Sequence, residues 1–275
     1  MKTRSIWTIA RKDLMEVQQN SMAWKPAIIV PFVFFVLIPV VVLVLPGIPF
    51  FQQQAFSSNV SIEQIRSVLP AEILSLIAGK TDAQIFPFIF LGYLFAPMFL
   101  IMPLMLSSIV AAESFAGERE RKTLEGLLYS PASDIELFLG KVLAALIPAL
   151  LVSWISFIIY TIIINTLGYP LMGEVWFPLN SWWPLIFWIT PAIAVLGISV
   201  TVLVSSRVNT FMEAYQSGAG LVVLVLGLVV GQATGIIYLN VPIGMLVGLV
   251  FWLIDAVLIW FCLKSFKRSQ LIGKL

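Results

Sequence analysis

Long runs without a single charged residue constrain the fold of this chain more than any other feature of its sequence. The runs cover residues 26–45, 83–112, 142–173, 175–206 and 214–254. A transmembrane helix needs about 20 apolar residues, so each of the first four runs suits one helix. The last run suits two helices, separated near Pro242, because proline ends helices. With 60% apolar and only 11% charged residues, the chain cannot cover a soluble surface, and we predict an all-α, polytopic membrane protein with six transmembrane helices.

The predicted helices form one transmembrane domain, residues 1–275. Their bounds are 26–45, 83–112, 142–165, 183–206, 218–239 and 243–263, with an outer loop at 46–82 and an inner loop at 113–141. With both termini inside, 14 of the 16 lysines and arginines lie on the cytoplasmic side, and only Arg66 and Lys80 face out. The positive-inside rule therefore predicts cytoplasmic N- and C-termini.

Residues 1–25 precede the first run and have an amphipathic pattern. Apolar side chains recur at helical spacing, at Ile6, Ile9, Ala10, Leu14 and Val17, and charged residues fall between them, at Arg11, Lys12, Asp13 and Glu16. The pattern predicts a helix lying in the inner headgroup layer of the membrane. The alternative is an ordinary positively charged flank that happens to be helical.

Several kinds of chemistry are excluded by missing residues. The chain has no histidine and a single cysteine, Cys262, so neither a zinc site built on histidines nor an internal disulfide is expected. The nearest match to the P-loop motif is AGKT at residues 78–81, but Leu74 stands where its first glycine belongs. We expect no catalytic residue, no metal ligand, no cofactor and no ATP hydrolysis in this chain itself.

The inner loop, residues 113–141, concentrates charge in a chain that otherwise has little. Residues 117–131 read GERERKTLEGLLYSP, in which Glu118 and Lys122 stand four apart in the order that favours a helix. Ser133-x-x-Glu136 has the form of a capping box that begins a new helix. Six acidic and four basic residues give the loop a net charge of −2, which excludes a nucleic-acid surface. A charged helix with a leucine edge suits docking of a cytoplasmic protein; a solvated loop that only separates two helices is the alternative.

This loop resembles that of the ABC type 2 transporter permeases, the membrane subunits of ATP-driven exporters. In that family a glutamate after the second span is followed by G-E-[RK]-E-x-x-T-L-E-x-L-L-x-x-P-[VA]-S and then by E-L-x-x-G-K. The matching residues are Glu113, Gly117, Glu118, Arg119, Glu120, Thr123, Leu124, Glu125, Leu127, Leu128, Pro131, Ala132, Ser133, Glu136, Leu137, Gly140 and Lys141. The segment IARKDL, residues 9–14, is similar to the family's N-terminal elbow helix.

The resemblance implies a permease subunit that works with a separate ABC ATPase (nucleotide-binding) subunit, which binds the ATP and Mg. The residues implied in coupling to that subunit are Glu113, Gly117, Glu118, Arg119, Glu120, Arg121, Thr123, Leu124, Glu125, Leu127, Leu128 and Pro131. A second permease copy, as a homodimer, contact with membrane lipid, and a place in a prokaryotic inner or plasma membrane are also implied. The expected activity is export, by alternating access, of a hydrophobic small molecule, a lipid or a peptide.

Glycines in the fifth predicted span form a GxxxGxxxG pattern at Gly227, Gly231 and Gly235. Small residues four apart let two helices approach closely in a membrane. We predict that this stripe packs against the second copy in the dimer; packing within one subunit is the alternative.

Asp255 is the one carboxylate well inside an apolar run. Acidic residues within the membrane are costly and mark functional sites. Asp255 is a candidate substrate or proton site, or it accepts a hydrogen bond from a neighbour. An ATP-independent secondary transporter or channel that uses Asp255 is therefore the alternative function, although the sequence has no evident inverted repeat. An intramembrane enzyme is disfavoured because the spans contain no histidine and no paired acids.

Overall fold

Helices account for all the regular secondary structure in the described part of the chain, which confirms the all-α prediction. The computed structural model describes residues 3–19, 21–44, 69–121, 133–208 and 210–265. The first half contains α1 (Thr3–Gln19), α2 (Ser21–Phe32), η1 (Val33–Leu37), α3 (Ile38–Val44), α6 (Ala71–Ile77), α7 (Asp82–Pro87), η3 (Phe88–Leu94), α8 (Phe95–Met98), α9 (Ile101–Ala112), η4 (Glu113–Gly117) and α10 (Glu118–Glu120). The second half contains α12 (Asp134–Met172), α13 (Trp182–Pro184), η5 (Leu185–Ile189), α14 (Thr190–Ser205), α15 (Phe211–Ala219), α16 (Val222–Ala233) and α17 (Val241–Ser265).

Five helical stretches are long and apolar enough to cross a membrane. They are Asp82–Glu120, Asp134–Met172, Trp182–Ser205, Phe211–Ala233 and Val241–Lys264. The apolar part of the first predicted span, 26–45, is the shorter helix Ile28–Val44. Most of the other stretches extend past the predicted bounds; the span predicted at 142–165, for example, is one helix of 39 residues. That helix begins at the predicted capping box, because the Ser133 hydroxyl accepts a hydrogen bond from the Glu136 N–H.

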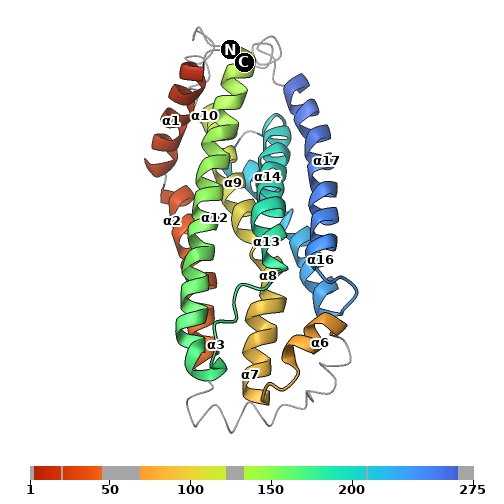
Figure 1. The fold of residues 1–275 in the computed structure, drawn as a ribbon. Coiled ribbons are helices and arrows are strands. Elements are labelled where there is room, and N and C mark those ends of the chain that lie inside the picture. The colour runs from red at the N-terminus through yellow and green to blue at the C-terminus, as the bar shows by residue number, and fades with distance from the viewer. Residues whose placement is uncertain (1–2, 20, 45–68, 122–132, 209, 266–275) are drawn as a thin grey trace.

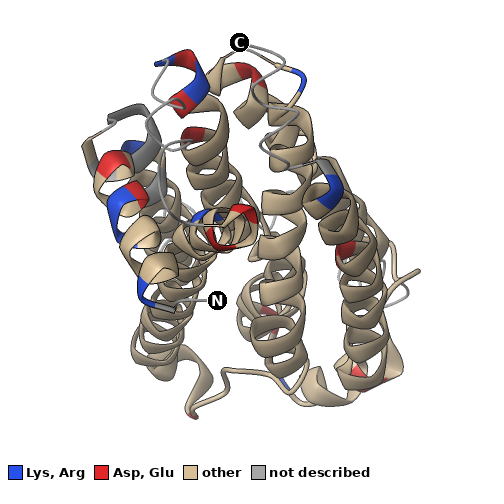
Figure 2. Ribbon diagram, turned by 90° about the horizontal axis from the view of Figure 1, so that it is seen from above, with Lys and Arg blue, Asp and Glu red and all other residues tan. Residues whose placement is uncertain are grey.

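The centre of the bundle is formed by α9 and α14, which pack on each other and both pack on α12 and α15; α14 also packs on α17. Figure 1 shows α1, α10 and the last turns of α17 at one end of the bundle, with α3 and α6 at the other. Seen from above, most of the ribbon carries no charge, and the charged residues gather in a few short segments (Figure 2). The fold therefore places the charged residues of α1 and α10 at the same end.

The glycine stripe of the fifth span is interrupted. Helix α16 ends at Ala233, and Gly235 lies in the turn beyond it with φ of 73°, a conformation that favours glycine. A Cβ atom at Gly231 would come within 2.8 Å of Ile237 Cδ1 in the same chain, whereas nothing lies within 4 Å of Gly227. The prediction of three glycines on one helix face is therefore wrong, because the helix stops before the third. The predicted dimer contact of this region is not tested.

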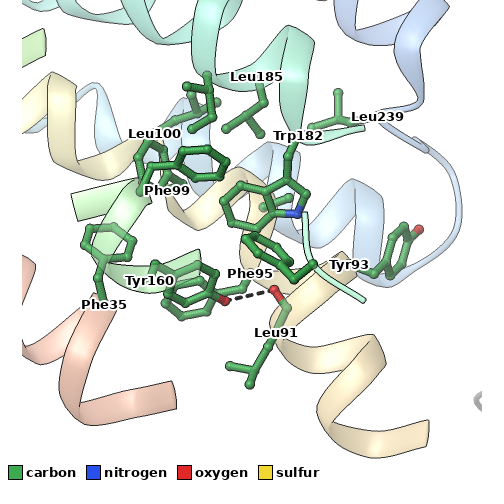
Figure 3. Packing of buried hydrophobic residues seen from close by; sticks show 14 of the residues in the cluster. Phe35, Leu91, Tyr93, Phe95, Phe99, Leu100, Tyr160, Trp182, Leu185 and Leu239 are labelled. Atoms are coloured by element: carbon green, nitrogen blue, oxygen red, sulfur yellow. Dashed lines mark hydrogen bonds between the residues drawn. The ribbon is translucent and has the colours of Figure 1, made fainter. Parts of the chain in front are cut away.

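Three consecutive carbonyl groups in the π-helical segment η3 accept hydrogen bonds from side chains of other helices. Pro97 has no N–H to donate to the carbonyl four or five residues earlier, at Tyr93 or Gly92. Gln232 Nε2 donates to Tyr93 O at 2.6 Å, and Trp182 Nε1 donates to Gly92 O at 2.7 Å. In Figure 3 the third donor, the Tyr160 hydroxyl, points to Leu91 O, at a distance of 2.8 Å. These bonds join α12, α13 and α16 to the bend in the second span.

Replacing Trp182 with phenylalanine is expected to lower the free energy of unfolding by about 1–3 kcal/mol, because it leaves the buried Gly92 carbonyl without a donor. The phenyl ring keeps most of the apolar contact. Trp183→Phe is the matched control, because Trp183 is the next residue in the chain and its side chain is 47% exposed. For this variant we expect the free energy of unfolding to change by no more than about 0.5 kcal/mol. Detergent-solubilised protein, unfolded in increasing denaturant, gives both values. Equal losses in the two variants would show that the indole hydrogen bond contributes nothing.

Candidate functional site

A network of acidic and basic side chains, four of them buried, joins α1, the η4–α10 segment and the start of α12. Its members are Lys12, Asp13, Glu16, Glu113, Glu118, Arg121 and Lys141. We call these seven residues the ionic network. They come from three places in the sequence, and the paired residues Asp13 and Lys141 are 128 positions apart, so only the fold brings them together.

Lys141 is the most enclosed cation of the network, with a side chain 2% exposed. Its Nζ lies 2.7 Å from Glu118 Oε2, 3.1 Å from Asp13 Oδ2 and 2.6 Å from Ser114 O. The same ammonium group stands 5.5 Å from the centre of the Phe115 ring. A buried charge is tolerated only when it is paired and hydrogen-bonded, and Lys141 meets both conditions.

Glu118 bridges the two lysines of the network. Its Oε1 accepts a hydrogen bond from Lys12 Nζ at 2.7 Å, and its side chain is 1% exposed. Burial alone lowers the pKa of Lys12, but the hydrogen bond and charge of Glu118 outweigh burial and raise that pKa above its ordinary value. This contribution to stability is fully present below the ordinary lysine pKa of about 10.4. It is lost only as the pH rises through the higher folded-state pKa.

The second half of the network is centred on Arg121. This arginine donates a hydrogen bond to the buried carboxylate of Glu113, and its Nη2 lies 3.7 Å from Glu16 Oε2. Burial by itself lowers the pKa of Arg121, but the hydrogen bond and charge of Glu113 raise it. A Cβ atom at Gly117 would come within 3.1 Å of Glu113 Oε2, so the glycine leaves room for this carboxylate.

Gly140, next to Lys141, lets α1 approach α12 closely. A Cβ atom at this position would lie 2.9 Å from Ile9 Cβ and 3.1 Å from the backbone oxygen of Ile6. Real Cβ contacts are longer than this, so any larger residue would push α1 away. The Gly-Lys pair thus has two linked roles: the glycine sets the distance between the helices, and the lysine forms the ion pair across it.

Arg119 and Glu120, the two remaining charged residues of the segment GERER (residues 117–121), bind the ends of other helices. Arg119 Nη1 donates to Ser205 O at 2.8 Å, at the C-terminus of α14, where a positive charge is favourable. Glu120 Oε2 accepts a hydrogen bond from the Phe211 N–H at 2.8 Å, at the N-terminus of α15, where a negative charge is favourable. The four charges from Glu118 to Arg121 therefore connect one short segment to α1, α12, α14 and α15.

The ionic network is suited to holding helices together rather than to binding a metal ion. Oxygen atoms of Asp13, Glu16 and Glu118 lie within 4.8 Å of one another. However, Lys12 and Lys141 already place ammonium groups against these carboxylates. Because the carboxylates already have cationic partners, a metal ion would have to displace a lysine.

The sequence-predicted coupling residues divide into two groups. Glu113, Gly117, Glu118, Arg119, Glu120 and Arg121 are brought together as described above, whereas Thr123, Leu124, Glu125, Leu127, Leu128 and Pro131 lie outside the described residues. Within the first group, Glu113 and Glu118 are each 1% exposed. Glu113 pairs with Arg121, and Glu118 pairs with Lys12 on α1 and Lys141 on α12. The coupling role of the whole set stays a prediction.

Sequence reasoning missed the partners of these glutamates. Asp13 was assigned to the polar face of the first helix, but it is 1% exposed. The spacing contained a signal for this: Ile6, Ala10, Asp13 and Val17 occupy one helical stripe, and all four are buried. From the sequence, Lys141 was named only as a residue that matches the family pattern. Asp255 lies on α17, which contributes no residue to the ionic network.

Comparison with known proteins identifies the family of the chain. No curated protein and no solved structure matched the chain. Residues 7–260 match the family model described as ABC-2 family transporter protein. The match covers nearly the whole chain and includes all seven members of the ionic network, so this multi-pass membrane protein belongs to the ABC-2 family of transporter proteins.

Proposed function

We propose that this chain is the permease subunit of an ATP-driven ABC exporter and that the ionic network couples it to the ATPase subunit. The observation that carries the proposal is the set of bonds from Glu118, Arg119, Glu120 and Arg121 to four different helices. A displacement of the segment from Glu118 to Arg121 is passed to all four helices, because each connection is a charged hydrogen bond or an ion pair.

The proposed topology has six spans with both termini in the cytoplasm. The first span is the continuous helix from Ser21 to Val44, which includes the apolar stretch Ile28–Val44. Helix α1 is the elbow helix at the membrane surface. In support, its Trp7 side chain is 59% exposed on the face away from α12, and Arg4 and Arg11 are also exposed. Tryptophan and arginine are favoured at the headgroup level.

In the proposed mechanism, the ATPase subunit docks on residues 117–131 and binds ATP and Mg, while this chain has no catalytic residue. Closure of two ATPase subunits moves this segment in each of two permease copies, which form a homodimer. The ionic network transmits the movement to α1 and α12, and Arg119 and Glu120 transmit it to α14 and α15. Access to the pore between the copies then alternates, and a hydrophobic small molecule, a lipid or a peptide is exported.

The test is co-purification with the ATPase subunit of the same transporter, followed by ATPase assays in lipid nanodiscs. Leu128→Asp places a charge on the expected docking edge, and we expect it to abolish binding while leaving the thermal stability of the permease unchanged. Met212→Asp is the matched control, because Met212 is an exposed apolar residue at the start of α15, where an acidic residue is tolerated. It should bind the ATPase normally.

Two results would contradict the proposal. The first is equal ATPase binding by Leu128→Asp and the control. The second is cargo transport by the permease without any ATPase subunit, which would favour the secondary transporter or channel.

A further inference from the structure

Asp255 faces α14 from the middle of α17. Gly248, Asp255 and Cys262 are spaced seven residues apart and are all buried, so they lie on one stripe of α17. Both before and after Asp255 in the sequence, residues of this stripe contact the continuous helix formed by η5 and α14. A Cβ atom at Gly248 would lie 2.2 Å from Trp188 Cδ1, and Cys262 Sγ donates to Ser199 O at 3.4 Å. The carboxyl group of Asp255 is therefore enclosed between these two contacts.

The helices that α17 mainly packs against carry no charge. Its side chain is 0% exposed, and within the described residues neither Oδ1 nor Oδ2 has a hydrogen-bond partner. The elements that pack against α17 are α14, η5 and α13, and none of them contains a charged or titratable residue. On α17 itself, the other titratable residues are Cys262, two turns away, and Lys264, whose ammonium lies 5.3 Å from the Trp260 ring.

These facts select one ligand for the carboxyl group. An ionised carboxylate that is enclosed without a counter-charge is unstable and becomes neutral. A metal ion needs several oxygen ligands, and an organic amine needs a space beside the carboxylate, whereas a proton needs neither. Among the described residues no side chain is hydrogen-bonded to either carboxylate oxygen, so the further ligands that a metal ion or an amine needs are not in place, and a proton is the ligand that fits.

We propose that Asp255 is a proton-binding site inside the membrane-spanning region, occupied while α17 is packed against α14. Separation of the two helices exposes the carboxyl group to water, where it releases the proton; renewed packing takes a proton up again. Each cycle of opening and closing is therefore linked to one proton. The proposal concerns the α14–α17 interface alone and holds whether or not an ATPase subunit drives the movement.

The first experiment uses dicyclohexylcarbodiimide, an apolar reagent that modifies protonated carboxyl groups. The full-length protein in nanodiscs is treated over a range of pH, and the modified peptides are identified by mass spectrometry. We expect modification at Asp255 that decreases as the pH rises and that is lost in Asp255→Asn. The ion-paired Glu113 and Glu118 serve as internal controls and should remain unmodified.

The second experiment compares the melting temperatures of the wild type and Asp255→Asn from about pH 5 to about pH 9, the range in which most proteins remain folded. Asparagine copies the neutral acid in shape. The wild type must keep its proton to stay packed, so its melting temperature should fall relative to the variant as the pH rises. A difference that does not change with pH would overturn the proposal. So would modification by the reagent that persists undiminished in Asp255→Asn.

Discussion

Replacing Lys141 with methionine is expected to lower the free energy of unfolding by about 3–5 kcal/mol, the usual cost of leaving a buried charge without its partner. Methionine keeps the length and apolar stem of lysine but has no charge. Asp13 and Glu118, at 1% exposure each, would lose the ammonium that lies 3.1 Å and 2.7 Å from their oxygens. The Ser114 carbonyl would also lose a donor. Denaturant unfolding of the purified permease measures the effect.

Lys12→Met is the matched control for this experiment. Lys12 pairs with the same two carboxylates, but its side chain is 42% exposed and water screens the interaction. We expect a loss of about 1 kcal/mol. The double variant Lys141→Met with Glu118→Gln should regain part of the stability, because it removes a carboxylate left without its buried partner. Equal losses at Lys12 and Lys141, or no recovery in the double variant, would contradict the described pairing.

Replacing Gly140 with leucine is expected to displace α1 from α12. The new side chain would meet Ile9 and the backbone of Ile6, which cannot move without shifting the helix. Overpacking of this kind costs about 1–3 kcal/mol. The shift also lengthens the ion pair between Lys141 and Asp13, so we expect a total loss of about 3 kcal/mol or more. In the functional assay, the variant should still bind the ATPase subunit but show weaker transport-linked ATPase activity.

Gly227→Leu controls for the loss of a helical glycine. Nothing lies within 4 Å of a Cβ atom at Gly227, and leucine is the better helix former. The stability of the single chain should equal or exceed that of the wild type, because the predicted dimer contact of Gly227 lies outside that chain. A Gly140→Leu variant with wild-type stability would show that α1 and α12 do not depend on this close contact. Proteolysis of the N-terminal segment offers an independent measure, since a displaced α1 should be cut faster.

Much of the fold could be predicted because the membrane imposes simple rules. Every backbone polar group must be satisfied within the lipid, so long apolar runs become helices. The runs at 83–112 and 175–206 contain most of the helical stretches Asp82–Glu120 and Trp182–Ser205, and the Ser133 capping box begins α12 as predicted. Helix bounds were less accurate, because α12 begins at Asp134, before its apolar run, and continues to Met172, past the predicted end at residue 165. The stop of α16 at Ala233 was also missed, since a glycine turn is hard to distinguish from a helical glycine in sequence.

The candidate site was only partly visible in the sequence. The charged residues of GERER indicated an important segment. Most of their partners lie on other helices, and the pairing depends on which helix faces pack together. Asp13 looked polar and therefore exposed, whereas the structure buries it against Lys141. Asp255 was singled out by its place in an apolar run, but its lack of a hydrogen-bond partner among the described residues became evident only from the packing of α17.

By itself, the amino-acid sequence determined that this protein is an all-helical membrane protein of the ABC-2 family, because hydrophobicity and motif order are local properties of the chain. Only the tertiary structure decided which charges are buried and what they bind. Glu118 could have faced a partner protein; it faces Lys12 and Lys141 instead, because α1 docks on α12 at Gly140. Such pairings depend on helix rotation and distance, and these are set by the packing of the whole bundle.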